Sequence, residues 1–171
     1  MRQYYIKTVK KGFTLLETII AIFIITIGIV GVSGLVSQTI SSVTISSQRL
    51  IAAYLTQEGI EIVRNIRDTN WLEGSAWDAG LGADDWEGDY NNLNLTSCPF
   101  ACEYDDLSSL KIDADGFYSY SAGNETKFKR KITIEDGPVP GDSLKVKVEV
   151  FWREKGKPYS VPAQENLYNW R

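Results

Sequence analysis

The chain has 171 residues, of which 43% are hydrophobic and 23% are charged, a balance typical of one globular domain rather than a disordered chain. It contains no histidine, which excludes a Ser-His-Asp or Cys-His catalytic unit and a histidine-based metal site, and no other catalytic constellation indicates an enzyme. Acids dominate residues 68–125, which argues against nucleic acid as an obligatory partner there, because phosphate binding needs clustered Lys and Arg.

A basic segment, residues 1–12, precedes an apolar segment, residues 13–36, whose single charge is Glu17. As a helix the apolar segment spans about 36 Å, which is enough to cross a bilayer core of about 30 Å. The basic residues before it predict that the N-terminal tail stays in the cytoplasm. The segment is too long for a secretory signal peptide and has no Ala-x-Ala-like cleavage site after it, so we expect a single-pass membrane anchor.

The junction between these segments reads Lys-Lys-Gly-Phe-Thr-Leu-Leu-Glu, from residue 10 to Glu17. It resembles the N-terminus of the type IV prepilin family, whose members share a basic leader, a glycine, a phenylalanine and a glutamate four residues later. The resemblance implies that a membrane prepilin peptidase cleaves between Gly12 and Phe13, so that residues 1–12 are a removed leader. It also implies methylation of the new Phe13 amine.

Glu17 is the one charged residue of the apolar segment. Placing a carboxylate at the bilayer centre costs a free energy on the order of 3 kcal/mol, so its presence needs an explanation. One interpretation is that Glu17 extends to the lipid headgroups near the membrane surface. The other is that it meets the Phe13 amine of a neighbouring subunit, which would neutralise the charge and set the axial stagger of packed helices. The surrounding motif favours this assembly role.

The helix should continue beyond the membrane as an amphipathic segment, residues 37–67. Apolar residues and one glycine recur there at spacings of three and four, which predicts one buried stripe. The stripe comprises Ile51, Leu55, Gly59, Ile62 and Ile66.

Residues 68–116 are rich in Gly, Asp, Asn and Trp, which predicts a long acidic loop. Trp71, Trp77 and Trp86 lie among its acids. Such aromatic side chains could bind sugar or a partner surface, but the favoured interpretation is that each anchors the loop onto the head.

Cys98 and Cys102 enclose only three residues. Zinc binding would need two further ligands, which would have to be carboxylates. Outside the cytoplasm we expect one disulfide across this short loop, where it fixes a local turn.

Asp113, Asp115 and Gly116 invite a calcium interpretation, and some secretion-system relatives of pilins bind calcium in a loop. The spacing departs from an EF-hand because Phe117 occupies the fifth position. An Asp-Gly turn before a strand at residues 117–120 is favoured instead, and no cofactor is expected.

Apolar and polar residues alternate through much of residues 117–171, which predicts an antiparallel meander with one apolar face. Such a sheet needs a cover, and the amphipathic helix is the only candidate. The expected fold class is α+β, a long N-terminal helical spine packed against a small antiparallel sheet, and the prepilin resemblance implies the same architecture.

These features predict a structural subunit, a minor pilin of a type IV pilus-like filament. Its expected partners are other pilin subunits, the prepilin peptidase, the inner membrane and the pilus assembly machinery, and its expected location is the membrane and then an extracellular or periplasmic filament. A type II secretion pseudopilin is an alternative. Another is a monomeric membrane-anchored binding module, which would gain nothing from an acid at Glu17.

Overall fold

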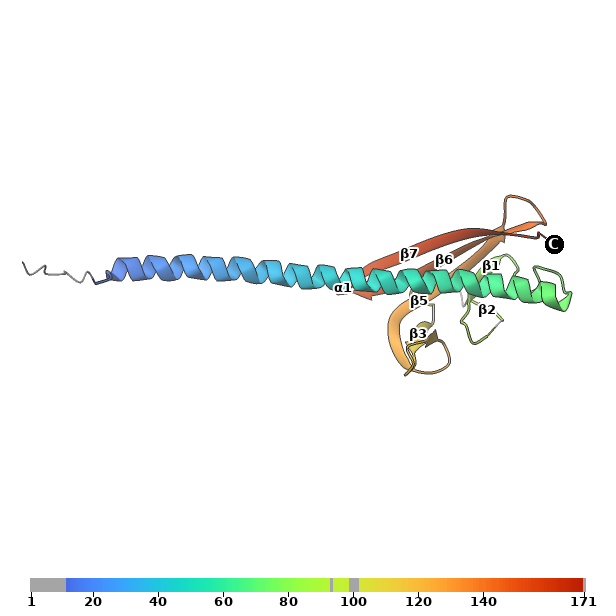
Figure 1. The fold of residues 1–171 in the computed structure, drawn as a ribbon, viewed down its shortest axis with the longest axis horizontal. Helices are drawn as coiled ribbons and strands as arrows, with labels where there is room; N and C mark the ends of the chain where they lie inside the picture. Colours follow the sequence, from blue (N-terminus) through green and yellow to red (C-terminus); the bar gives the residue numbers. More distant parts are fainter. Residues whose placement is uncertain (1–11, 93, 99–101, 171) are drawn as a thin grey trace, which may run out of the picture. The chain divides into compact units, whose positions relative to one another are not determined.

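The computed structural model describes residues 12–92, 94–98 and 102–170. Within these residues the chain forms one α-helix followed by seven β-strands (Figure 1). It divides into two structural units, Met1–Thr44 and Ile45–Arg171. Helix α1 (Leu15–Glu73) begins in the first unit and ends in the second, which also contains every strand. The prediction of an α+β fold is confirmed.

Helix α1 does not end near residue 67, as the sequence pattern predicted, but continues to Glu73. Gly74 then adopts a left-handed conformation with φ +73°. The amide of Gly74 donates to the carbonyl of Trp71 (3.3 Å), and that of Ser75 donates to the carbonyl of Asn70 (2.9 Å). This pair of bonds is a Schellman motif, which satisfies the last helical carbonyls and requires a residue that tolerates positive φ. Gly74 therefore sets the helix end.

Strand β5 (Asn124–Asp136) is the centre of the sheet. On one side it pairs with β6 (Ser143–Glu154), which pairs with β7 (Lys157–Tyr168). On the other side its first half pairs with β3 (Ser109–Ile112), and its second half pairs with β1 (Asp84–Glu87). Two short strands complete the sheet: β2 (Thr96–Ser97) beside β1, and β4 (Tyr118–Ser119) beside β3. All pairings are antiparallel, as the alternation predicted.

The acidic segment is more regular than predicted, because β1, β2 and β3 lie within residues 68–116. The sequence of β1, Asp-Asp-Trp-Glu, carries little strand propensity. It becomes a strand because the exposed edge of β5 offers it partners, with Trp86 opposite Ile132. Pairing to a neighbour that is distant in sequence thus overrides the local preference of this segment.

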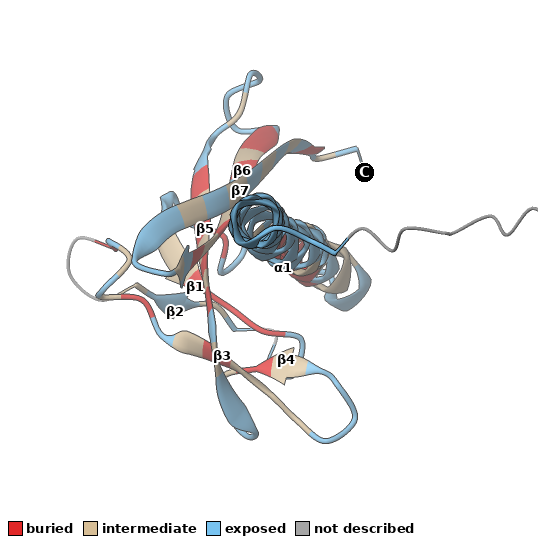
Figure 2. Ribbon diagram, turned by 90° about the vertical axis from the view of Figure 1, so that its left-hand side faces the viewer, coloured by how far each residue is buried: buried red, intermediate tan, exposed pale blue. Residues whose placement is uncertain are grey.

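Within the second unit, α1 covers the inner face of the sheet (Figure 2). The predicted stripe is confirmed, since Leu55, Gly59, Ile62 and Ile66 are buried and Ile51 is half-buried. The buried apolar residues form two clusters. One joins the helix at Ile60–Ile66 to β5, β6 and β7, and the other joins Ala52 and Leu55 to Phe128, Val150 and Trp152.

Gly59 lies at the helix–sheet contact between these clusters. A Cβ atom there would lie 2.7 Å from Cγ1 of Val148 and 3.1 Å from Cδ of Arg130. Real Cβ atoms do not approach so closely, so only glycine permits this separation of the helix and the sheet.

Strand β7 forms one edge of the sheet, since β6 is its sole partner strand among the described residues. It contains Pro158 and Pro162, which stand opposite Arg153 and Glu149 of β6. A proline lacks the N–H that a ladder position would use, so these two positions face away from β6. The free edge therefore lacks two of the donors that another strand would need.

Candidate functional site

The predicted processing site, Gly12 and Phe13, lies immediately before α1. Gly12, Phe13 and Thr14 are exposed and non-helical, and Phe13 is 84% exposed. Thr14 is the N-cap, because its Oγ1 accepts a hydrogen bond from the backbone N–H of Glu17 (3.2 Å). Because a peptidase must grip extended backbone, this placement leaves the Gly12–Phe13 bond accessible. The remainder of the predicted leader, residues 1–11, lies outside the described residues.

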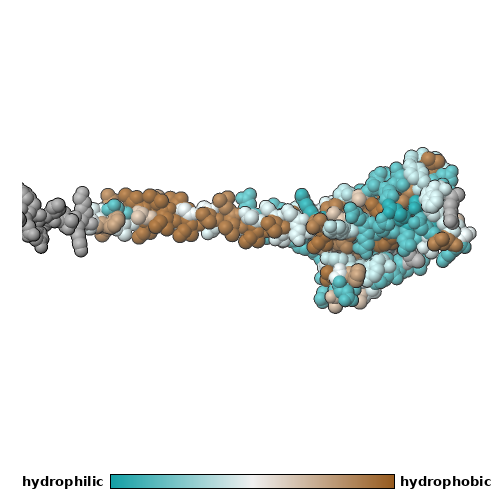
Figure 3. Space-filling view, viewed as in Figure 1, coloured by the Kyte–Doolittle hydropathy of each residue, from teal (hydrophilic) through white to brown (hydrophobic). Residues whose placement is uncertain are grey.

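Glu17 occupies the third helical position, where a glutamate commonly completes a capping box with an N-cap threonine. Its side chain is exposed, and within the described residues its carboxylate has no hydrogen bond or ion pair. On the face drawn in Figure 3, the helix of the first unit is predominantly hydrophobic. The helix is long and apolar enough to cross a membrane, and none of its most apolar window is buried in the protein. It therefore fits membrane anchoring.

Cys98 and Cys102 are joined by a disulfide, with their Cα atoms 5.7 Å apart. Cys102 is buried and has a left-handed backbone, with φ 55°. The bond closes a five-residue segment, so its restraint is local and it adds little to global stability.

Asp113 organises the turn before β4. Its Oδ1 accepts hydrogen bonds from the amides of Asp115 and Phe117, both at 2.9 Å, and Gly116 has φ +90°. The carboxylate is thus engaged by its own backbone, as an Asp-Gly turn requires. Within the described part of the chain, no three acidic or cysteine side chains gather as metal ligands.

Some side chains of the acidic segment, residues 68–125, contact bases of the sheet. Lys131 pairs with Asp85 (3.5 Å), and Arg153 pairs with Asp105 (3.2 Å). Lys129 donates to the carbonyl of Tyr104 (2.9 Å). The three bases alternate with the buried positions of β5 and β6 and so lie on the outer face of the sheet. These contacts tie parts of the acidic segment to the outer face of the sheet.

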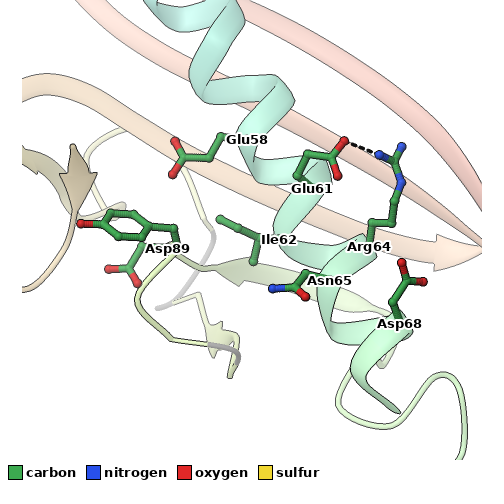
Figure 4. Close-up of a pocket in the computed structure, with 8 residues that line it drawn as sticks. Glu58, Glu61, Ile62, Arg64, Asn65, Asp68 and Asp89 are labelled. Atoms are coloured by element: carbon green, nitrogen blue, oxygen red, sulfur yellow. Dashed lines mark hydrogen bonds and ion pairs between the residues drawn. The ribbon is translucent and has the colours of Figure 1, made fainter. Parts of the chain in front are cut away.

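The second unit has an acidic cleft of about 400 Å³ beside α1 (Figure 4). Helix residues on one side face the segment of Asp89 on the other. Its carboxylates are engaged: Glu61 pairs with Arg64, and Asp89 accepts from the amide of Tyr120 (2.8 Å). Arg64 also donates to Glu165 (2.6 Å), and this bond, above all, raises the pKa of Arg64. The cleft is a satisfied charge network, not an empty cation site.

Arg130 is a buried residue that the sequence reasoning missed. It is fully buried, and it donates to the carbonyls of Leu55 (3.0 Å) and Gly88 (2.5 Å) and pairs with Glu58 (3.3 Å). Its Nε has no partner among the described residues. The sequence does indicate its burial, because the alternation of the strand places Arg130 at an inward position between Phe128 and Ile132. Arg130 links the helix, the sheet and the segment after β1.

The three tryptophans of the acidic segment have different surroundings. Trp77 is buried in the larger cluster, as the anchor interpretation predicts. Trp71 is half-buried, with its ring 4.5 Å from that of Trp170 and beneath the guanidinium of Arg67 at 4.6 Å. Trp86 is also half-buried, and its Nε1 donates to the carbonyl of Gly82 (3.0 Å).

The N-terminus matches a family model described as the prokaryotic N-terminal methylation motif, over residues 7–33. This span contains Gly12, Phe13 and Glu17 together with most of the apolar segment. No curated protein and no solved structure matches the chain. The motif implies processing by a prepilin peptidase and assembly with other pilins. A motif of this kind, followed by an apolar helix and an antiparallel sheet, supports a prepilin-like or type IV pilin-like protein.

Proposed function

We propose that the chain is a minor pilin, a structural rather than enzymatic subunit of a type IV pilus-like filament. In this proposal the peptidase cleaves after Gly12, the Phe13 amine is methylated, and residues 13–36 anchor the subunit and then polymerise. The observation that carries the proposal is the methylation motif over residues 7–33. The exposed, non-helical backbone at Gly12 and Phe13 supports it.

The proposed subunit contact joins the Glu17 carboxylate to the Phe13 amine of a neighbour. Two features support this contact. Within the described residues Glu17 has no partner of its own, and the apolar surface around it would make an unpaired charge costly in lipid or in a packed bundle. The basic leader keeps the N-terminus cytoplasmic before cleavage, and the head then lies outside the cytoplasmic membrane.

The test compares Glu17→Gln and Glu17→Val with Thr14→Ala in the native host. Gln at position 17 keeps the size of the side chain but carries no charge, whereas Thr14→Ala removes the N-cap and keeps the charge. We expect both Glu17 variants to insert into the membrane and be cleaved. Their incorporation into filaments should fall sharply, because a neighbour's amine is left buried without a counter-charge, at roughly 3–5 kcal/mol.

The measurement is the amount of each variant in sheared filaments relative to the amount in membranes. Thr14→Ala should incorporate nearly as well as the wild type. If Glu17→Val also incorporates like the wild type, the carboxylate has no assembly role and a simple membrane anchor becomes the better interpretation. Recovery of the protein only in a short periplasmic fibre would instead identify a pseudopilin.

A further inference from the structure

A second cavity, of about 380 Å³, lies in the head at the C-terminal end of α1. The last turns of the helix form one wall through Ile66, Thr69, Asn70 and Glu73. Trp86 of β1 and Asn94 lie on the other side. Its volume is in the range of small-molecule sites in proteins, and like them it combines an aromatic ring with a few polar groups.

The apolar part of the cavity is fixed in position. Ile66 is buried, and Trp86 and Leu95 pack against the larger core cluster. The indole N–H of Trp86 is already used by the carbonyl of Gly82, so the ring cannot rotate freely and offers its apolar surface instead. A ligand would therefore meet an aromatic side chain that is held in place.

The polar part offers hydrogen-bonding groups that the described residues do not use. The side chains of Thr69, Glu73 and Asn94 have no hydrogen bond to any of these residues. The amide nitrogen of Asn70 donates to the carbonyls of Trp77 (3.1 Å) and Ala79 (2.9 Å), which leaves its Oδ1 free to accept. The cavity thus presents a hydroxyl, a carboxylate and two amides around one indole.

Charge narrows the class of ligand. No lysine or arginine is among the described residues that line the cavity, so nothing there would neutralise a phosphate, sulfate or carboxylate. Glu73 would repel such anions and accept hydrogen bonds from hydroxyl groups. A flat apolar surface with acceptors and donors at its rim matches a ring that has an apolar C–H face and equatorial hydroxyls.

We propose that this cavity binds a neutral sugar ring, a hexose or N-acetylhexosamine at the end of a glycan. The ring stacks on Trp86, and its hydroxyls bond to Glu73, Asn94 and the Oδ1 of Asn70. This inference goes beyond the proposed filament role and does not depend on it. A chain that failed to assemble could still bind sugar, and an assembled one could fail to bind it.

The test uses the full chain purified in detergent micelles. The purified protein is first applied to a panel of immobilised neutral glycans and to their sialylated and sulfated counterparts. The wild type should retain neutral hexose or N-acetylhexosamine termini and not the anionic forms. Titration calorimetry with the best neutral oligosaccharide then compares variants.

Ala79→Leu should abolish binding, because Ala79 lines the cavity and is exposed, so a larger side chain fills the space without removing a core contact. Glu73→Gln should weaken binding about tenfold or more, since it replaces a charged hydrogen-bond acceptor. Glu61→Gln, on the same helix but in the acidic cleft, is the matched control and should bind like the wild type. Unchanged melting curves exclude misfolding of the variants.

Two results would overturn the proposal. One is a panel in which no neutral glycan is retained or only anionic glycans are. The other is equal affinity of the wild type and Ala79→Leu, which would place any sugar site elsewhere on the head.

Discussion

At the scale of single residues, Arg130 shows how a charge is accommodated inside a small head. Burying a guanidinium is costly unless hydrogen bonds and an opposite charge compensate it. Here two backbone carbonyls and Glu58 do so, and one of those carbonyls belongs to Gly88 in the segment after β1. Arg130 therefore connects the segment after β1 to the helix and the sheet.

Removing this side chain should destabilise the head strongly. We expect Arg130→Ala to lower the free energy of unfolding by roughly 3–5 kcal/mol, because it leaves a cavity, removes the donor to the carbonyl of Gly88 and leaves Glu58 without its ion-pair partner. Arg130→Met should cost clearly less, since it fills the volume and buries no unpaired Nε. Denaturant unfolding of the full chain measures both. An unchanged midpoint in Arg130→Ala would contradict the linking role.

The environment of Tyr120 should make the stability of the head depend on pH in the alkaline range. Burial raises the pKa of Tyr120 well above its usual value of 10.0, and its hydroxyl donates to the carbonyl of Arg130 (3.4 Å). The folded state keeps this proton, whereas the unfolded state loses it above pH 10. Stability contributed by Tyr120 is therefore present below pH 10 and is lost as the pH rises above it.

Tyr120→Phe should flatten this decline, because Phe has no proton to lose in either state. The measurement is the unfolding midpoint between pH 8 and pH 11 for both proteins. Parallel pH profiles would show that another group governs the alkaline loss. Tyr54, which is 64% exposed, provides the control through Tyr54→Phe and should leave the slope unchanged.

At the scale of elements, the contact of α1 with β6 depends on the missing side chain of Gly59. Gly59→Ala should raise helix propensity by about 1 kcal/mol but lower overall stability by about 1–3 kcal/mol, because its Cβ would overlap Val148. Adding Val148→Ala removes the opposing methyl groups. The double variant should then be more stable than the sum of the two single changes predicts.

Thermal unfolding of the four proteins gives this coupling energy. If the stability changes of the two single variants add up to that of the double variant, the helix moves away from the sheet at no cost in free energy.

The sequence predicted those elements whose patterns are local. The alternation of apolar residues predicted the positions of β5, β6 and β7, and the stripe from Leu55 to Ile66 predicted the buried face of α1. It could not predict β1, because Asp84 and Asp85 become strand residues only beside β5. It did not predict Gln48 as a core residue either, since its burial depends on accepting a hydrogen bond from the indole of Trp152 (2.9 Å).

At the scale of the whole molecule, the sequence displays the N-terminal motif more directly than the sites of the head. Gly12, Phe13 and Glu17 belong to one motif, residues 7–33, whose spacing along the chain can be seen in the sequence itself. The cavity of Trp86 and Glu73 joins positions on a helix, a loop and a strand, and only the fold brings them together. The sequence shows where the tryptophans lie along the chain, but it could not predict that Trp77 is buried and Trp86 only half-buried.

The whole-molecule prediction is that the mature chain begins at Phe13. Mass analysis of protein from its native cell should show a methylated Phe13 at the N-terminus. Gly12→Leu should leave a membrane-bound precursor, because a bulky side chain obstructs the backbone that the peptidase must bind. An intact Met1 start in assembled material would refute the cleavage.

The two prolines of β7 affect how heads that lie close together on a membrane can interact. Subunits held in one membrane face each other at high local concentration, where an open strand edge invites sheet-to-sheet addition between heads. Pro158 and Pro162 remove donors from that edge and so block a continuous ladder. In the proposed filament, heads would then lie side by side without forming cross-strand aggregates, and polymer growth would depend on the N-terminal helices.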